Sequence, residues 1–246
     1  MTTKTLNISE EQLVDYSKAH NEPSWMTELR KKALKLTETL EMPKPDKTKL
    51  RKWDFDTFKQ HHTTGDAYTQ LTDLPKSVKE IIDVENSENL IIQHNNELAY
   101  TQVSDQAKHD GVIIEGLSEA LVNHSDLVQK YFMTKAVDVD EHRLTALHTA
   151  LVNGGIFVYV PKNTVVEHPI QYVVLHDDEQ ASFYNHVIIV TEESAEVTYV
   201  ENYLSTTSGE DNQLNIVSEV IAGANSNVTY GSVDYLDKGL SLIHIS

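Results

Sequence analysis

Two patterns of apolar positions divide the chain. Through most of residues 1–154, apolar side chains recur at steps of three and four, which is typical of amphipathic helices. From residue 155 onward they form short runs rich in β-branched and aromatic residues, which is typical of strands. The sequence therefore predicts an α+β protein in which an N-terminal helical region precedes a strand-rich region.

The first two helices are predicted from their capping residues. Ser9 and Gln12 have the spacing of a capping box, which favours a short helix starting there. A longer amphipathic helix is predicted to begin at Pro23, which suits a first helical turn, and to end before Pro43. Its basic face, which includes Arg30, is expected to be a solvated surface and not a binding patch.

Two more helices are predicted over residues 117–124 and 138–152. Gly154 follows the second of these and is the expected stop signal. His148 lies on the apolar face of that helix. A histidine in such a position is more often a hydrogen-bonded core residue than a ligand, so we expect it to be one.

A small β element interrupts the helical region. Residues 90–94 and 98–103 alternate with a period of two on either side of Asn95-Asn96, a pair that favours a tight turn. These features predict a hairpin. Residues 111–114 predict a third strand close to it.

The strand-rich region contains an internal repeat. An offset of 31 residues aligns residues 158–166 with 189–197 and again with 220–228. Each copy has a β-branched pair, a polar turn, a small residue and then a valine that starts the next strand. Such a period is typical of a solenoid, whose units stack on one another because none closes a core alone. We predict the first coils of a right-handed parallel β-helix over residues 155–239, truncated at its end, with a β-sandwich as the alternative.

The last seven residues, 240–246, form a separate segment. Their sequence, LSLIHIS, is what translation of the transposon end sequence used in preparing sequencing libraries would give. We therefore interpret the segment as a sequencing-adaptor scar and exclude His244 from any site. The alternative is a natural apolar terminal strand.

Composition narrows the classes of function. The chain has 38 acidic and 20 basic residues and a net charge of −18, so binding to nucleic acid or to an anionic membrane surface is not expected. With no cysteine, the chain cannot form disulfides, use a thiolate in catalysis or hold an iron–sulfur cluster by its own thiolates. No secretory signal is evident, and the apolar runs are far shorter than the about 20 residues that span a bilayer. A cytoplasmic protein is expected.

Candidate chemistry in the strand-rich region is limited to three histidines near carboxylates. His168 follows Glu167, His176 precedes Asp177, and His186 stands alone. Imidazole and carboxylate groups bind iron, zinc or manganese, but no His-x-His, His-Glu-x-x-His or facial-triad spacing is present. No glycine-rich phosphate loop occurs either. We therefore assign no catalytic, cofactor-binding or metal residue.

Several stretches resemble the SufB/SufD family of iron–sulfur cluster assembly proteins. Their order and spacing along residues 1–239 make the resemblance specific. They are Glu22-Pro23-Ser24-Trp25-Met26 with Arg30, Ala146 to Ala150, Gly155 to Lys162, Val166 to Gln171, Asn185 to Val190, and Val200 to Tyr203. The absence of cysteine places the chain closer to the SufD side of the family than to the SufB side.

The resemblance implies a scaffold subunit and not an enzyme. Such proteins pair with SufB through their β-helices, and each binds a SufC ATPase through a C-terminal helical domain, in a SufBCD complex. The nascent iron–sulfur cluster, and reduced flavin, would then belong to the complex, with no cofactor bound by this chain alone. By analogy the later coils and the SufC-docking helices are missing here, so no site residue is transferred, and a fragment of marginal solubility is expected.

A second hypothesis comes from a different class of function. A standalone β-helix enzyme, a hydrolase or lyase acting on a small or sugar substrate, could use Glu167, His168 and Asp177. The acidic composition argues against an anionic substrate for such an enzyme. The two hypotheses differ in whether these three side chains meet in one site.

Overall fold

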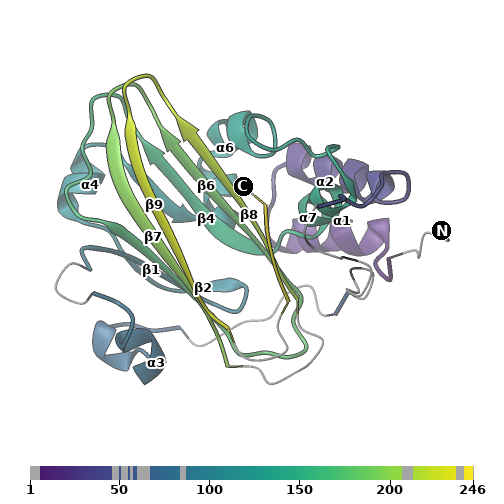
Figure 1. Ribbon diagram of the computed structural model, residues 1–246, viewed down its shortest axis with the longest axis horizontal. Coiled ribbons are helices and arrows are strands. Elements are labelled where there is room, and N and C mark those ends of the chain that lie inside the picture. Colours follow the sequence, from purple (N-terminus) through teal and green to yellow (C-terminus); the bar gives the residue numbers. More distant parts are fainter. Residues whose placement is uncertain are drawn as a thin grey trace.

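Two five-stranded sheets face each other, and helices pack outside them. The computed structural model describes residues 6–45, 50, 55, 58–59, 67–83, 87–206, 213–236 and 241–245. Figure 1 shows α1, α2 and α7 grouped beside the sheet that contains β4, β6 and β8, with α3 and α4 on the opposite side of the molecule. The α+β class predicted from the sequence is confirmed.

The elements follow the predicted order. The helices are α1 (Glu10–Ala19), α2 (Ser24–Leu36), the short 3₁₀ helix η2 (Leu71–Asp73), α3 (Lys76–Lys79), α4 (Asp105–His109), α5 (Leu117–Asn123), α6 (Ser125–Tyr131) and α7 (Arg143–Leu151). The strands are β1 (Asn89–His94), β2 (Glu97–Gln102), β3 (Ile113–Gly116), β4 (Gly154–Val160), β5 (Ile170–His176), β6 (Phe183–Thr191), β7 (Glu196–Ser205), β8 (Gln213–Ala222), β9 (Asn227–Tyr235) and β10 (Ser241–Ile245). The predicted hairpin is β1 and β2, which pair antiparallel.

Consecutive strands of the second half alternate between the two sheets. One sheet has the order β2-β1-β5-β7-β9, and the other has the order β10-β8-β6-β4-β3. From β4 to β9, neighbours within a sheet pair in parallel, whereas the hairpin partner β2 and the strand β3 are antiparallel additions at the first edges. The chain thus crosses from one sheet to the other after each strand.

The predicted 31-residue repeat is the register of three parallel pairs, β4–β6, β6–β8 and β7–β9, whereas in β5–β7 the paired residues are 29 apart. Val158 pairs with Ile189 between β4 and β6, and Val197 pairs with Val228 between β7 and β9. Val190 likewise pairs with Ile221 between β6 and β8. Equivalent positions of the repeat therefore lie directly beside each other in the stack.

The turn that follows β4, β6 and β8 has the same backbone geometry in each copy. Asn163, Ser194 and Asn225 have positive φ angles of 61°, 61° and 57°. The Asn163 N–H donates to the carbonyl of Glu193 at 3.0 Å, and the Ser194 N–H donates to the carbonyl of Ala224 at 2.9 Å. The turns therefore form a hydrogen-bonded ladder of their own beside the strands.

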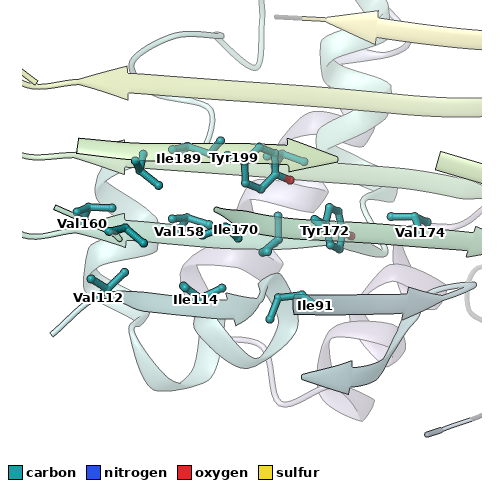
Figure 2. Packing of buried hydrophobic residues seen from close by; sticks show 14 of the residues in the cluster. Ile91, Val112, Ile114, Val158, Val160, Ile170, Tyr172, Val174, Ile189 and Tyr199 are labelled. Carbon is teal, nitrogen blue, oxygen red and sulfur yellow. The ribbon is translucent and has the colours of Figure 1, made fainter. Parts of the chain in front are cut away.

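The main core lies between the two sheets. Figure 2 shows Val158, Val160 and Ile189 from one sheet packed with Ile170 and Tyr199 from the other. The repeat valines that restart each strand are part of this cluster, two of them buried and the third partly buried: Val166, Val197 and Val228. The alternating pattern of the sequence thus marks the inward face correctly.

The first two helices confirm their predicted starts, with one correction. Ser9 and Gln12 form the capping box of α1, and α2 begins directly after Pro23. However, Arg30 is not on a solvated face: its side chain is 2% exposed. Its guanidinium binds the Glu22 carboxylate at 2.6 Å and donates to the carbonyls of Ala150 and Val152. The prediction was wrong because the partners that bury Arg30 lie about 120 residues away in the sequence.

The helices before the sheet differ from the prediction: η2, α3 and α4 were not predicted, and there are three further differences. The last helix starts at Arg143 and not at residue 138, because His142 caps it by accepting from the Thr145 N–H. Gly154 is the first residue of β4 and not the stop of that helix. Helix α6 was not predicted; it follows α5 directly.

The C-terminal segment adds an edge strand. β10 pairs in parallel with β8, from Ser241 beside Gln213 to Ile245 beside Val217. The division into residues 1–154, 155–239 and 240–246, with the last as a scar, stays a prediction.

Gly155 provides a test of the close packing between β4 and β6. Its φ angle is 142°, and a Cβ atom there would lie 2.0 Å from the carbonyl oxygen of His186. Gly155→Ala should therefore lower the free energy of unfolding by about 2–5 kcal/mol, since backbone strain and overpacking add. Urea denaturation measures the change. Gly231→Ala is the matched control, because the nearest atom to its added Cβ is 4.0 Å away; equal losses in the two variants would contradict the expectation.

Candidate functional site: buried polar networks and an exposed strand edge

The three histidines considered as metal ligands do not converge. His168 lies in the segment before β5, His176 is the last residue of β5, and His186 is in the other sheet, on β6. Among the residues that the structure describes, no group of three or more His, Asp or Glu side chains could hold a metal ion.

His186 is instead the centre of a buried chain of hydrogen-bonding side chains. Its Nδ1 lies 3.0 Å from Nε2 of His148 on α7, and its Nε2 lies 3.0 Å from Oε1 of Glu219 on β8. At the other end, Nδ1 of His148 lies 2.8 Å from Oδ1 of Asn215. The side chains of His186 and Glu219 are fully buried. His148 is therefore the hydrogen-bonded core histidine that its position on an apolar helix face predicted.

Backbone N–H groups complete the environment of Glu219. Its carboxylate accepts from the N–H of Met133 at 2.7 Å and from the N–H of Val137 at 3.2 Å. The ring of Phe132 packs on the ring of His186 at 4.4 Å between centroids. Burial, with His186 beside it, holds the pKa of His148 well below its usual value. The chain thus connects a helix, two strands and the segment after α6.

A second hydrogen-bonded group, which joins the buried His94 to the exposed Asp177, lies at the end of β5. Nε2 of His94 lies 2.8 Å from the Asp177 carboxylate, and Asn95 donates to the same carboxylate at 3.0 Å. Partial burial raises the pKa of Asp177, but these hydrogen bonds outweigh it and hold the pKa below the usual value. His176 is buried against the ring of Phe183, and burial lowers its pKa to about 4. The Asp177 carboxylate is thus held by two hydrogen-bonding side chains, His94 and Asn95.

The residues of the enzyme hypothesis lie at opposite ends of one strand. Glu167 and His168 precede β5, and Asp177 follows it. Because a strand rises about 3.3 Å per residue, a strand of this length separates the two ends by about 20 Å. Glu167 is exposed, and the carbonyl of His168 accepts from the Asn89 side chain at 2.9 Å. The structure does not bring these three side chains into one site.

Polar groups also occur inside the core between the sheets. Tyr172 donates to Gln93 at 2.5 Å, and Asn185 donates to the Tyr203 hydroxyl at 3.1 Å. Farther along the stack, the buried carboxylate of Glu201 accepts from two tyrosine hydroxyls, those of Tyr199 and Tyr230.

Sequence reasoning missed the two buried glutamates. The signal for both was an acidic residue in the interior of a strand rich in apolar residues, Glu201 in β7 and Glu219 in β8. Such a glutamate either points outward to solvent or is buried with a hydrogen-bonding partner. The pattern of apolar and polar residues in the strand does not distinguish these two cases.

The strand β9 presents an exposed edge. It is the last strand of its sheet, and within the described residues no strand pairs with its outer side. Three large apolar side chains of the last two long strands are exposed: Val220 at 38%, Val233 at 41% and Tyr235 at 52%. An edge with free backbone groups and apolar side chains is a template for pairing with another strand. No helix in the described part of the chain is long and apolar enough to cross a membrane.

Family comparisons define the class of protein. A family model described as "SufBD protein N-terminal region" matches residues 10–172, and one described as "SUF system FeS cluster assembly, SufBD core domain" matches residues 173–245. Together they span most of the chain, so the chain belongs to the SufB/SufD family. The resemblance inferred from the sequence is confirmed.

Individual relatives make the similarity more specific. The iron–sulfur cluster assembly protein SufD of Bacillus subtilis (strain 168) is 48% identical over 237 residues, which are 96% of this chain and 54% of that protein. An iron–sulfur cluster assembly SufBD family protein of Staphylococcus epidermidis is 26% identical over 236 residues, which are 92% of this chain and 50% of that protein. The chain spans about half the length of these curated relatives.

The buried histidines predict a loss of stability in acid. The pKa values of His148 and His176 are lowered in the fold, so between those values and the ordinary 6.5 the unfolded chain binds more protons. The free energy of unfolding should therefore fall as the pH drops below about 6.5, by about 1.4 kcal/mol per pH unit for each such histidine. Urea unfolding at several pH values measures the slope. His176→Phe should flatten it, whereas His109→Gln, at an exposed position, should not; an unchanged slope in His176→Phe would contradict this explanation.

The exposed edge predicts self-association of this chain. The double substitution Val233→Lys with Tyr235→Lys should reduce the oligomeric fraction, since charged side chains on an edge strand oppose strand pairing. Size-exclusion chromatography with light scattering measures that fraction. Val122→Lys on α5 is the matched control, because Val122 is 51% exposed but lies away from the edge. A wild-type chain that is monodisperse and monomeric would refute the prediction.

Proposed function

We propose that the chain is a non-catalytic scaffold subunit in iron–sulfur cluster assembly. The observation that carries the proposal is the pair of family matches over residues 10–172 and 173–245, the second of which is described by that process. The 48% identity to a protein named as an assembly protein supports it. The separation of Glu167 and His168 from Asp177 supports a structural and not a catalytic use of these residues.

The proposal extends to the architecture of the core. Strands that alternate between two sheets and stack in parallel at intervals of 29 to 31 residues from β4 to β9 have the arrangement of coils. We infer that they are the first coils of a right-handed parallel β-helix, since crossovers between parallel strands are right-handed in nearly all proteins. The exposed edge of β9 is then the place where a further coil, or a strand of a partner, would pair.

The partners in this proposal are SufB and the SufC ATPase, in a cytoplasmic SufBCD complex. Because residues 1–246 contain no cysteine, thiolates that hold sulfur or a nascent cluster have to come from outside this segment, and the proposal assigns them to a partner. The cluster is therefore cargo of the complex, and reduced flavin, where it is used, acts at the level of the complex. The acidic net charge fits protein partners better than nucleic acid or membrane.

A chimera tests the proposal. The half of Bacillus subtilis SufD that matches this chain is replaced by residues 1–239, and the chimera is co-expressed with the SufB and SufC of that organism. We expect a stable heteromer with ATPase activity that forms clusters on an acceptor apoprotein. A folded chimera that fails to co-purify with SufB would overturn the scaffold assignment.

A matched variant of the chimera separates scaffold from enzyme. Replacing Glu167, His168 and Asp177 by Ala should leave both assembly and cluster formation unchanged, because the scaffold proposal gives these side chains no chemical role. Retained assembly with abolished turnover would instead favour the enzyme hypothesis. Circular dichroism of the variant shows whether a loss reflects misfolding.

A further inference from the structure

The buried chain from Asn215 through His148 and His186 to Glu219 has no role in the proposed function. It is held between α7, β6 and β8, with its histidines and glutamate fully buried. Each link is a hydrogen bond of 2.8 to 3.0 Å. The number of protons in such a chain follows from which atom donates at each link.

The observed orientation of Asn215 fixes the donors along the chain. Its Oδ1 faces Nδ1 of His148 and can only accept, so Nδ1 of His148 carries a proton. A neutral His148 then accepts at Nε2 from a protonated Nδ1 of His186. The remaining nitrogen of His186, Nε2, faces Oε1 of Glu219. This last link requires one more proton, carried either by the ring or by the carboxyl.

The surroundings of Glu219 favour the proton on the ring. Two backbone N–H groups, those of Met133 and Val137, donate to the carboxylate oxygens. Hydrogen bonds of this kind stabilise the ionised form of a carboxyl group. In this arrangement His186 is an imidazolium that forms an ion pair with Glu219, and the buried network has no net charge.

Without that proton, the chain can keep every link only by reversing its direction. Nε2 of His186 still donates to the Glu219 carboxylate, but its Nδ1 now accepts from Nε2 of His148. Nδ1 of His148 in turn must accept, which requires the amide of Asn215 to rotate and present its NH₂ group. We propose that these four side chains form a buried proton-binding site with two hydrogen-bonded states, one proton apart, that are linked by rotation of the Asn215 amide.

The other charged groups near the chain are already paired or exposed. From α2, Arg30 is bound to Glu22 and to carbonyls that follow His148 in the sequence. From β6, Tyr184 contributes its ring, 6.3 Å from that of His148. In the segment after α6, Lys135 and Asp138 are exposed. Proton release would therefore leave the Glu219 carboxylate as an uncompensated buried charge, which weakens the contact between the helices and the sheet.

Nuclear magnetic resonance of the whole chain labelled with ¹⁵N-histidine tests the proposal. In the proton-loaded state, His186 should show two protonated ring nitrogens and His148 a protonated Nδ1 only. As the pH is raised from about 5 to about 9, His186 should lose its Nδ1 proton while His148 changes to the Nε2-protonated tautomer, both with one midpoint. A single protonation state of both rings throughout, or two independent midpoints, would refute the proposal.

Two variants and a control separate the site from general effects of pH. Glu219→Gln should leave His186 neutral at a pH where the wild-type ring is doubly protonated. Asn215→Asp offers only acceptors to His148, so the reversal is blocked and His186 should stay doubly protonated to a higher pH. His109→Gln, at an exposed position, should leave both signals unchanged. If Asn215→Asp left the transition unchanged, the coupling to the amide would be wrong.

Discussion

The register between neighbouring parallel strands is the constraint on which the rest of the structure depends. Val158 pairs with Ile189, and Val197 with Val228, because these two returns of the chain each take 31 residues, whereas the return that places Ile170 beside Tyr199 takes 29. One inserted residue would turn the following strand over and place its polar side chains in the core. The polar turns help to hold the spacing between these strands. Asn163, Ser194 and Asn225 adopt the same left-handed conformation, and the turns hydrogen-bond to one another. Asparagine tolerates this conformation well, whereas serine at the middle turn bears a cost that the stack must offset.

The polar side chains buried within the stacked sheets are each held by specific hydrogen-bonding partners. Glu201 and Glu219 are carboxyl residues that an apolar core between two sheets does not need, and burying each without partners would cost several kcal/mol. Both are fully provided with donors, two tyrosine hydroxyls for Glu201 and two N–H groups with a histidine for Glu219. Buried carboxylates specify how neighbouring elements pack more strictly than methyl groups do, because a shift by one residue would leave a carboxylate without its hydrogen-bond donors. Glu201 therefore favours one register of β9 on β7, and Glu219 favours one position of the segment after α6 on the sheet.

Much of the fold was predictable from local sequence patterns. The site was not, because its side chains bind partners that are far away in the sequence. The strands, the hairpin and the repeat were predictable because alternation and turn residues act within a few positions of the chain. The burial of Arg30 was not, because its carbonyl partners follow His148, more than a hundred residues away. The same holds for His186, which the sequence presented as a possible ligand and the fold pairs with Glu219. A charged residue on a helix face has the same local pattern whether water or a distant carboxylate surrounds it.

The strands β8 and β9 carry the two proposals, on different sides. The edge that would accept another strand is the backbone side of β9, whereas the proton site uses side chains of β8 that point toward α7. Backbone pairing at an edge depends on spacing and not on the protonation of a neighbouring sheet, so a failed assembly test would leave the proton site intact. Conversely, the β10 pairing with β8 ends at Val217, two residues before Glu219. A strand that continued this pairing would lie beside Glu219 without touching the hydrogen bonds of its carboxylate, since these lie on the face of the sheet and not at its edge.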